Sequence, residues 1–161
     1  MASIKGVALK NVRKLGGCVC DSCVEASIWL DGERIGALSD TGCGGHTAIT
    51  IGSADDEHTL KDRAEAFFMD YPTEYPNLDF FFSFVMALLD AEDYYKQSAK
   101  DGFGILVTEN PLIFACVEDE PACAEGAYRL SADAPEPIVN ACKKDLKNPC
   151  VYRGLDDFTI A

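Results

Sequence analysis

The feature that most constrains the fold is a pair of strand-like runs joined by Asp31-Gly32. From Cys23 to Leu30 the even-numbered positions are apolar, and the chain returns in extended character from Arg34 to Leu38. Asp-Gly between two such runs is a strong hairpin signal, because both positions tolerate a positive φ. The sequence therefore predicts a β-hairpin with one apolar face for the core.

More strands are expected around this hairpin, and helices are expected after it. Residues 4–12 alternate loosely and residues 47–51 are β-branched, so both runs predict strands. Gly52-Ser53 ends the β region, and two helices are expected within 54–100. The second of these helices is apolar on almost every side from Leu78 to Leu89, which is typical of a central core helix or an interface.

The C-terminal third predicts a second hairpin and a final helix. The runs Phe103–Thr108 and Leu112–Val117 flank Glu109-Asn110-Pro111, a turn-like sequence. Beyond them, Asp133 can cap a helix whose apolar stripe includes Val139.

These elements predict an α+β fold in a single domain covering residues 1–161. Its parts are a β-rich segment 1–52, a helical segment 54–100, and a β-hairpin plus helix over 102–161. The expected architecture is a mainly antiparallel sheet, with two central helices and one C-terminal helix packed on it. At 161 residues and 48% hydrophobic content, the chain is long enough to bury such a core.

The chain is strongly acidic, with 27 acidic against 14 basic residues and a formal net charge of −13. This charge repels nucleic acid and anionic membranes and suits a basic partner surface. Acidic clusters such as Asp90, Glu92 and Asp93 are candidate contacts. Because neither a signal peptide nor a transmembrane run is found, the expected location is the cytoplasm. The alternative, that the acidity serves solubility alone, stays open.

Soft metal ligands gather at the open end of the predicted hairpin. Cys18, Cys20 and Cys23 precede its first strand, and Cys43 and His46 follow its second. Since a hairpin returns its open ends to one place, Cys20, Cys23, Cys43 and His46 are candidate ligands of a tetrahedral zinc. The alternative is no cofactor, with the eight cysteines present as reduced thiols that pack as small hydrophobes.

The turn from Gly42 to His46 is rich in glycine. Gly42, Gly44 and Gly45 indicate positive φ angles or close backbone approach, and their amides are candidate anion donors. The Lys-Ser/Thr of a phosphate-binding loop is absent from the sequence, which argues against a Walker motif. Cys43 beside His46 is also a nucleophile–base hypothesis, but no third orienting residue is evident, so no residue is assigned a catalytic role.

Over residues 8–52 the chain resembles a largely uncharacterised family of small proteins carried by bacteriophages, prophages and plasmids. The residues that carry this resemblance are Cys23, Ala26, Asp31, Gly32, Gly36, Ser39, Gly42, Gly44 and Gly45. The chain departs from the family's pattern around the Gly-Gly pair, where it has Cys first and His second. The resemblance implies an accessory protein of a mobile element that acts inside a bacterial cell, and it lends no catalytic residue.

Two functions are therefore expected as alternatives. The first is a non-enzymatic interaction protein that inhibits a host defence complex by binding its basic, nucleic-acid-binding surface, as anti-CRISPR proteins do by analogy. The second is a binding protein or enzyme for a small ligand such as a signalling nucleotide, using the Gly42–His46 turn and a structural zinc. The apolar run 78–89 adds the expectation of a homodimer. The candidate binding residues are Asp31, Gly32, Gly42, Gly44, Gly45, Asp90, Glu92 and Asp93.

Overall fold

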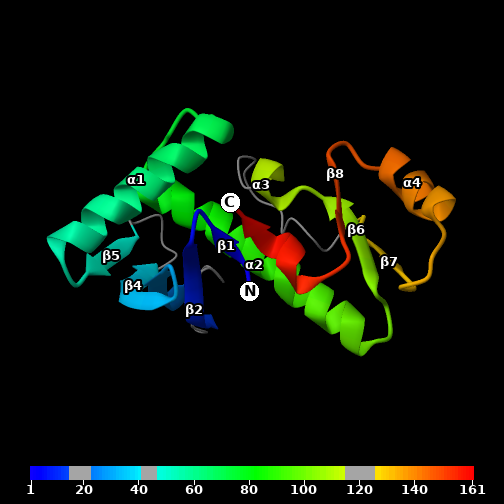
Figure 1. Cartoon of the computed structure of the whole chain (residues 1–161), viewed down its shortest axis with the longest axis horizontal. Helices are drawn as coiled ribbons and strands as arrows, with labels where there is room; N and C mark the ends of the chain where they lie inside the picture. The colour runs from blue at the N-terminus through cyan, green and yellow to red at the C-terminus, as the bar shows by residue number, and fades with distance from the viewer. Residues whose placement is uncertain (15–22, 41–46, 115–125) are drawn as a thin grey trace. The chain divides into compact units, whose positions relative to one another are not determined.

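The computed structural model describes residues 1–14, 23–40, 47–114 and 126–161, and it confirms the predicted α+β class (Figure 1). The described residues form two compact units. We call Ser3–Val85 with Ile160–Ala161 the N-terminal unit, and Met86–Thr159 with Met1–Ala2 the C-terminal unit. The first five described strands lie within residues 1–52, and the first two described helices lie within residues 54–100.

The N-terminal unit is built on a six-stranded sheet with the order β5-β4-β3-β2-β1-β9. The strands are β1 (Ser3–Ile4), β2 (Val7–Lys14), β3 (Val24–Leu30), β4 (Glu33–Asp40), β5 (Ala48–Ile51) and β9 (Thr159–Ile160). Neighbours from β1 to β5 pair antiparallel. Asp31 and Gly32 link β3 to β4 with φ angles of 48° and 94°, so the predicted hairpin is confirmed with the left-handed geometry that Asp-Gly favours.

One side of this sheet is buried together with helix α1 (Ala54–Asp70) and the start of helix α2 (Leu78–Lys100). Ala26, Ile28 and Leu30 on β3 are all buried, as their alternation predicts. The Phe67 ring of α1 lies 5.6 Å from Phe81 and 5.1 Å from Phe84 of α2, measured between ring centroids. The two helices therefore contact each other on the same side of the sheet.

The apolar run of α2 is largely core. Its fully or nearly fully buried members are Phe81, Phe82, Phe84, Val85 and Leu88. The expected homodimer stays a prediction, because burial within one chain neither requires nor excludes a second copy.

A glycine is needed where β4 meets β5. A Cβ atom on Gly36 would lie 2.2 Å from the Thr50 carbonyl oxygen, a distance that no side chain tolerates. Gly36 thus allows close approach of the two strand backbones, so packing alone explains why a glycine stands at this position.

The C-terminal unit has its own three-stranded antiparallel sheet, with the order β7-β6-β8. Its strands are β6 (Ile105–Glu109), β7 (Tyr128–Leu130) and β8 (Pro149–Tyr152). Helix α4 (Glu136–Lys144) buries Val139 against Ile105 and Val107 of β6. The C-terminal helix therefore packs on this second sheet, whereas a single sheet was expected.

The predicted second hairpin is wrong. Residues 112–114, expected to begin a strand, belong to the short helix α3 (Pro111–Phe114), and β6 instead pairs with β7 and β8. The Asn110 side chain accepts a hydrogen bond from the Leu112 amide at 3.0 Å, and Pro111 occupies the first helical position. Both features start a helix rather than a turn between strands. A 3-10 helix, η1 (Leu155–Phe158), follows β8 and stacks Phe158 on Tyr152 with ring centroids 4.1 Å apart.

Candidate functional site

The glycine-rich turn and most of the proposed zinc ligands lie outside the described residues. These positions are Cys20, Gly42, Cys43, Gly44, Gly45 and His46. The strand ends that lead to them do lie side by side, since Val24 pairs with both Lys14 and Asp40. The zinc site and the small-ligand function of this turn stay predictions.

Cys23 corrects the expectation that all thiols are reduced. It is disulfide-bonded and only 2% exposed, whereas Cys142 and Cys150 carry free thiols. A disulfide sulfur offers no thiolate to zinc, so a zinc site that includes Cys23 requires the bond to be reduced first. Within the described ranges no three His, Cys, Asp or Glu side chains are grouped to hold a metal ion.

Asp31 and Gly32 have a structural explanation in the hairpin turn. The Asp31 carboxylate accepts a hydrogen bond from the Arg63 guanidinium of α1 at 3.0 Å. The Asp31 amide donates to the Gly6 carbonyl at 2.9 Å. The turn is thereby attached both to α1 and to the β1–β2 connection, which accounts for Asp31 without any ligand.

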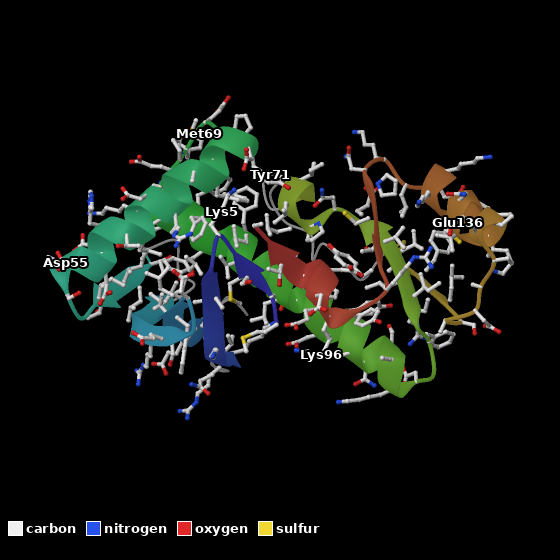
Figure 2. All side chains as sticks on the ribbon, in the orientation of Figure 1. Lys5, Asp55, Met69, Tyr71, Lys96 and Glu136 are labelled. Atoms are coloured by element: carbon white, nitrogen blue, oxygen red, sulfur yellow. The ribbon has the colours of Figure 1, made fainter. Side chains whose placement is uncertain are left out.

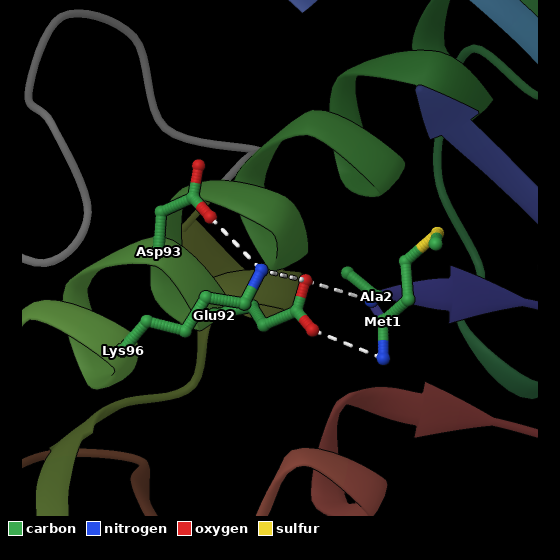
Figure 3. Close-up of polar contacts among 5 residues, drawn as sticks. All are labelled: Met1, Ala2, Glu92, Asp93 and Lys96. Atoms are coloured by element: carbon green, nitrogen blue, oxygen red, sulfur yellow. Dashed lines mark hydrogen bonds and ion pairs between the residues drawn. The ribbon is translucent and has the colours of Figure 1, made fainter. Parts of the chain in front are cut away.

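The acidic cluster on α2 divides into buried and exposed members. Glu92 is fully buried in the C-terminal unit, so it is not part of an exposed acidic surface and the sequence-based interpretation is corrected there. Its carboxylate accepts the Ala2 amide at 2.9 Å and lies 3.0 Å from the Met1 ammonium (Figure 3). Lys96 contacts Glu92 at 3.1 Å and Asp93, whose side chain is 65% exposed, at 3.2 Å.

The donors around Glu92 stabilise its charge against the cost of burial. Burial by itself raises the pKa of Glu92, but hydrogen bonds from Ala2, the amino terminus and Lys96 outweigh it and hold this pKa below its ordinary value. For Lys96, burial lowers the pKa, but the contacts with Glu92 and Asp93 raise it overall. Glu92 is therefore a structural carboxylate that stays ionised at neutral pH.

An exposed acidic surface is found instead on α1, formed by Asp55, Asp62 and Glu65, which we call the acidic helix surface. Their spacing of seven and three residues places them on one side of the helix. The two basic residues of α1, Lys61 and Arg63, pair elsewhere, with Glu57 and Asp31. In the part of the chain that the structure describes, no lysine or arginine pairs with the acidic helix surface.

Sequence reasoning missed this surface because it searched for acidic residues adjacent in the chain. Helical spacing applied to 54–70 could have found it. Met69 follows Glu65 by four residues, and it is 84% exposed. Figure 2 shows Asp55 and Met69 at the two ends of α1.

The second candidate is a hollow of about 410 Å³ on the other side of the N-terminal sheet, which we call the sheet hollow. All its described lining residues come from strands β2 to β5. Its polar lining residues are Asn11, Arg13, Glu25, Ser27, Arg34, Ser39 and Thr50. Its volume lies in the range of roughly 300–1,000 Å³ that is usual for small-molecule sites.

The strand register and one side-chain hydrogen bond determine where the lining residues of the sheet hollow lie. Ser27 pairs with Ala37, which pairs with Thr50, so small side chains form the floor. The Asn11 side-chain amide donates to the Ser27 hydroxyl at 3.5 Å. Next to the hollow, the Lys10 ammonium lies 3.6 Å from the centre of the Trp29 ring.

No described helix is long and apolar enough to cross a membrane. Comparison of the chain with models of known families, with curated proteins and with solved structures finds no match. Its function therefore has to be inferred from the arrangement of its own residues.

Proposed function

We propose that this chain is a non-enzymatic interaction protein of a phage or another mobile element, which inhibits a host defence complex in the bacterial cytoplasm. It would do so by binding a basic, nucleic-acid-binding surface of that complex. The single observation that carries the proposal is the acidic helix surface on α1.

The acidic helix surface has the properties of a docking face for a basic partner. The Asp62 side chain is 60% exposed, and it lies 3.6 Å from the imidazole of His58, which carries charge only when protonated. Carboxylates without a lysine or arginine partner keep their charge available to another molecule. The net charge of −13 adds a field of the same sign, which accelerates encounter with a basic surface.

Met69 supplies the apolar element that such an interface needs. Rim charges mostly govern encounter rate and specificity, whereas buried apolar anchors supply most of the affinity. Met69 lies one helical turn beyond Glu65 and is almost fully exposed. An unbranched, polarisable side chain of this kind adapts well to a partner surface.

The test is a pull-down with the tagged chain from a bacterial lysate that contains defence complexes, washed at low and then at high salt. The test variant carries Asp62→Lys with Glu65→Lys. The control carries Glu33→Lys with Asp156→Lys, which makes the same change in net charge at exposed positions outside α1. We expect wild type and control to retain a partner that high salt releases, and the α1 variant to lose it.

Two results would contradict the proposal. If both variants lose the partner equally, binding depends on total charge rather than on α1. If neither loses it, the acidic helix surface is not the contact. Met69→Ala gives a further check, because it should weaken the same interaction without changing its salt dependence.

A further inference from the structure

The arginines of this chain fall into two groups, those that form an ion pair and those that form none with a described residue. The three that form ion pairs are Arg63 with Asp31 at 3.0 Å, Arg129 with Asp101 at 2.9 Å and Arg153 with Glu136 at 2.8 Å. The other two, Arg13 and Arg34, form no ion pair with any described residue, although the chain has 27 acidic residues. Both line the sheet hollow.

A β-bulge places Arg13 at the hollow. Lys10 pairs with Ser27 and Arg13 pairs with Glu25, so β2 advances three residues while β3 advances two. Asn11 takes a φ of 53° within this bulge, a conformation that asparagine tolerates better than most residues. Under regular alternation Val12 would occupy this place on the hollow side, and Arg13 would point to the core side.

A second bulge follows Arg34 on β4. Ile28 pairs with Gly36, but the next residue, Trp29, pairs with Arg34, so β4 contains one extra residue. Across the two-residue turn Leu30 pairs with Glu33 and Trp29 with Arg34, and the extra residue, Ile35, keeps Arg34 on the same side of the sheet as Ala37 and Ser39. Bulges commonly redirect a side chain next to a binding site. The β2 bulge and the β3–β4 turn therefore bring two arginines without an ion pair to the same hollow.

We propose that the sheet hollow binds a small phosphorylated compound that also carries hydroxyl groups, such as a ribonucleotide. Guanidinium groups bind phosphate oxygens through paired hydrogen bonds, and Arg13 and Arg34 are available for this. The hydroxyls of Ser27 and Thr50 add neutral donors. Glu25 accepts hydrogen bonds only, so it suits a hydroxyl group of the ligand rather than its phosphate.

The volume of the sheet hollow and the negative charge of the chain both favour a small ligand over a nucleic-acid strand. The hollow is open to solvent and has a volume of about 410 Å³. The net charge of −13 repels a long polyanion, whose many phosphates would extend beyond the two arginines. This site is separate from the acidic helix surface, because its described lining comes from strands β2 to β5 and not from α1, and the inference does not depend on the function proposed above.

Trp29 provides the readout, because it is the only tryptophan of the chain and it pairs directly with Arg34. Binding should be followed by Trp29 fluorescence and by calorimetry. The probes are ADP, ribose 5-phosphate, inorganic pyrophosphate and adenosine. We expect the three phosphorylated probes to bind and adenosine not to bind, with ADP or ribose 5-phosphate tighter than pyrophosphate.

Variants then assign the contacts. Arg13→Gln and Arg34→Gln should each weaken ADP binding about 10-fold or more, the effect of losing one charge-assisted contact. Lys144→Gln, which removes the same charge from an exposed position in the C-terminal unit, should change it less than about 2-fold. Glu25→Gln should leave pyrophosphate binding unchanged or tighter and weaken ribose 5-phosphate, because Glu25 meets only the hydroxyl groups.

Three outcomes would overturn the inference. The first is no binding of any phosphorylated probe at millimolar concentration. The second is equal affinity of the Arg13→Gln, Arg34→Gln and Lys144→Gln proteins. The third is Arg13-dependent binding of a DNA or RNA oligonucleotide that is tighter than ADP, which would make the hollow part of a nucleic-acid surface. Circular dichroism of each variant verifies that the sheet is intact.

Discussion

Three charged side chains show that the two units of this chain surround charge differently. In the C-terminal unit, Glu92 is completely buried and contacts three donors, from Met1, Ala2 and Lys96. In the N-terminal unit, Arg13 and Arg34 are exposed and form no ion pair within the described residues. One charge is enclosed by its own chain, and the other two are left to solvent.

The difference separates structural charges from binding charges. A buried carboxylate is tolerated only when hydrogen bonds replace the water that it has lost, so its partners are part of the fold. An exposed arginine keeps its hydration and contributes little to folding, but it remains available to a ligand. The comparison therefore predicts large stability effects at Glu92 and small ones at the two arginines.

The largest effect is expected for Glu92→Ala. Removing the carboxylate leaves the Ala2 amide and the Met1 ammonium without their acceptor, and we expect a loss of about 3 kcal/mol in the free energy of unfolding. Asp93→Ala is the matched control on the same helix, and it should cost about 0.5 kcal/mol or less because this pair is exposed. Urea denaturation measures both. Equal effects would show that Glu92 is not a structural charge.

The pH dependence of stability should follow Glu92. Its folded-state pKa lies below the ordinary 4.5, so its contribution is fully present above about pH 4.5 and is lost as the pH falls through the folded pKa. The difference in unfolding free energy between wild type and Glu92→Gln should therefore be constant at neutral pH and shrink in acid. Urea midpoints measured from neutral to acidic pH test this. A difference that grows in acid would reverse the assigned shift.

A smaller effect is expected for Arg63→Gln, which removes a paired but exposed arginine. Arg63 and Asp31 are 41% and 57% exposed, so solvent screens their interaction and we expect a loss of about 0.5 kcal/mol. Thermal and urea denaturation measure it. A loss as large as that of Glu92→Ala would show that pairing rather than burial makes a charge structural here.

The smallest effects on folding are expected for Arg13→Gln and Arg34→Gln. Neither side chain has an ion pair to lose, so the unfolding free energy should stay within about 0.5 kcal/mol of wild type. The same proteins should lose ligand binding, which separates the two roles cleanly. A large destabilisation would indicate that these arginines serve the sheet and would remove the stability argument for a ligand site.

Turn residues and apolar alternation gave correct predictions for elements that depend on neighbouring residues alone. Asp31-Gly32 and the apolar alternation of residues 24–30 correctly predicted a hairpin and its buried side. The same reasoning failed at residues 112–114, because Asn110 and Pro111 start a helix as readily as they make a turn. The placement of strands in two sheets depends on pairings between distant residues such as Leu106 and Tyr152, for which no local signal exists.

The candidate sites depended even more on the tertiary structure. Glu92 looks like its neighbours Asp90 and Asp93 in the sequence, and only the packing of the C-terminal unit makes it buried. The sequence did not predict that Arg13 and Arg34 lie on the same side of the sheet. Each bulge shifts the alternation of side chains by one residue, and the residues around a bulge do not predict where that shift occurs.

By itself, the sequence determined the α+β class, the first hairpin, the two central helices and the acidic balance, since these follow from short-range periodicity, turn chemistry and charge. The tertiary structure decided which charged side chains are buried and which are exposed to solvent. Burial and strand register are set by residues far apart in the chain, and their energies act only once the fold brings those residues together.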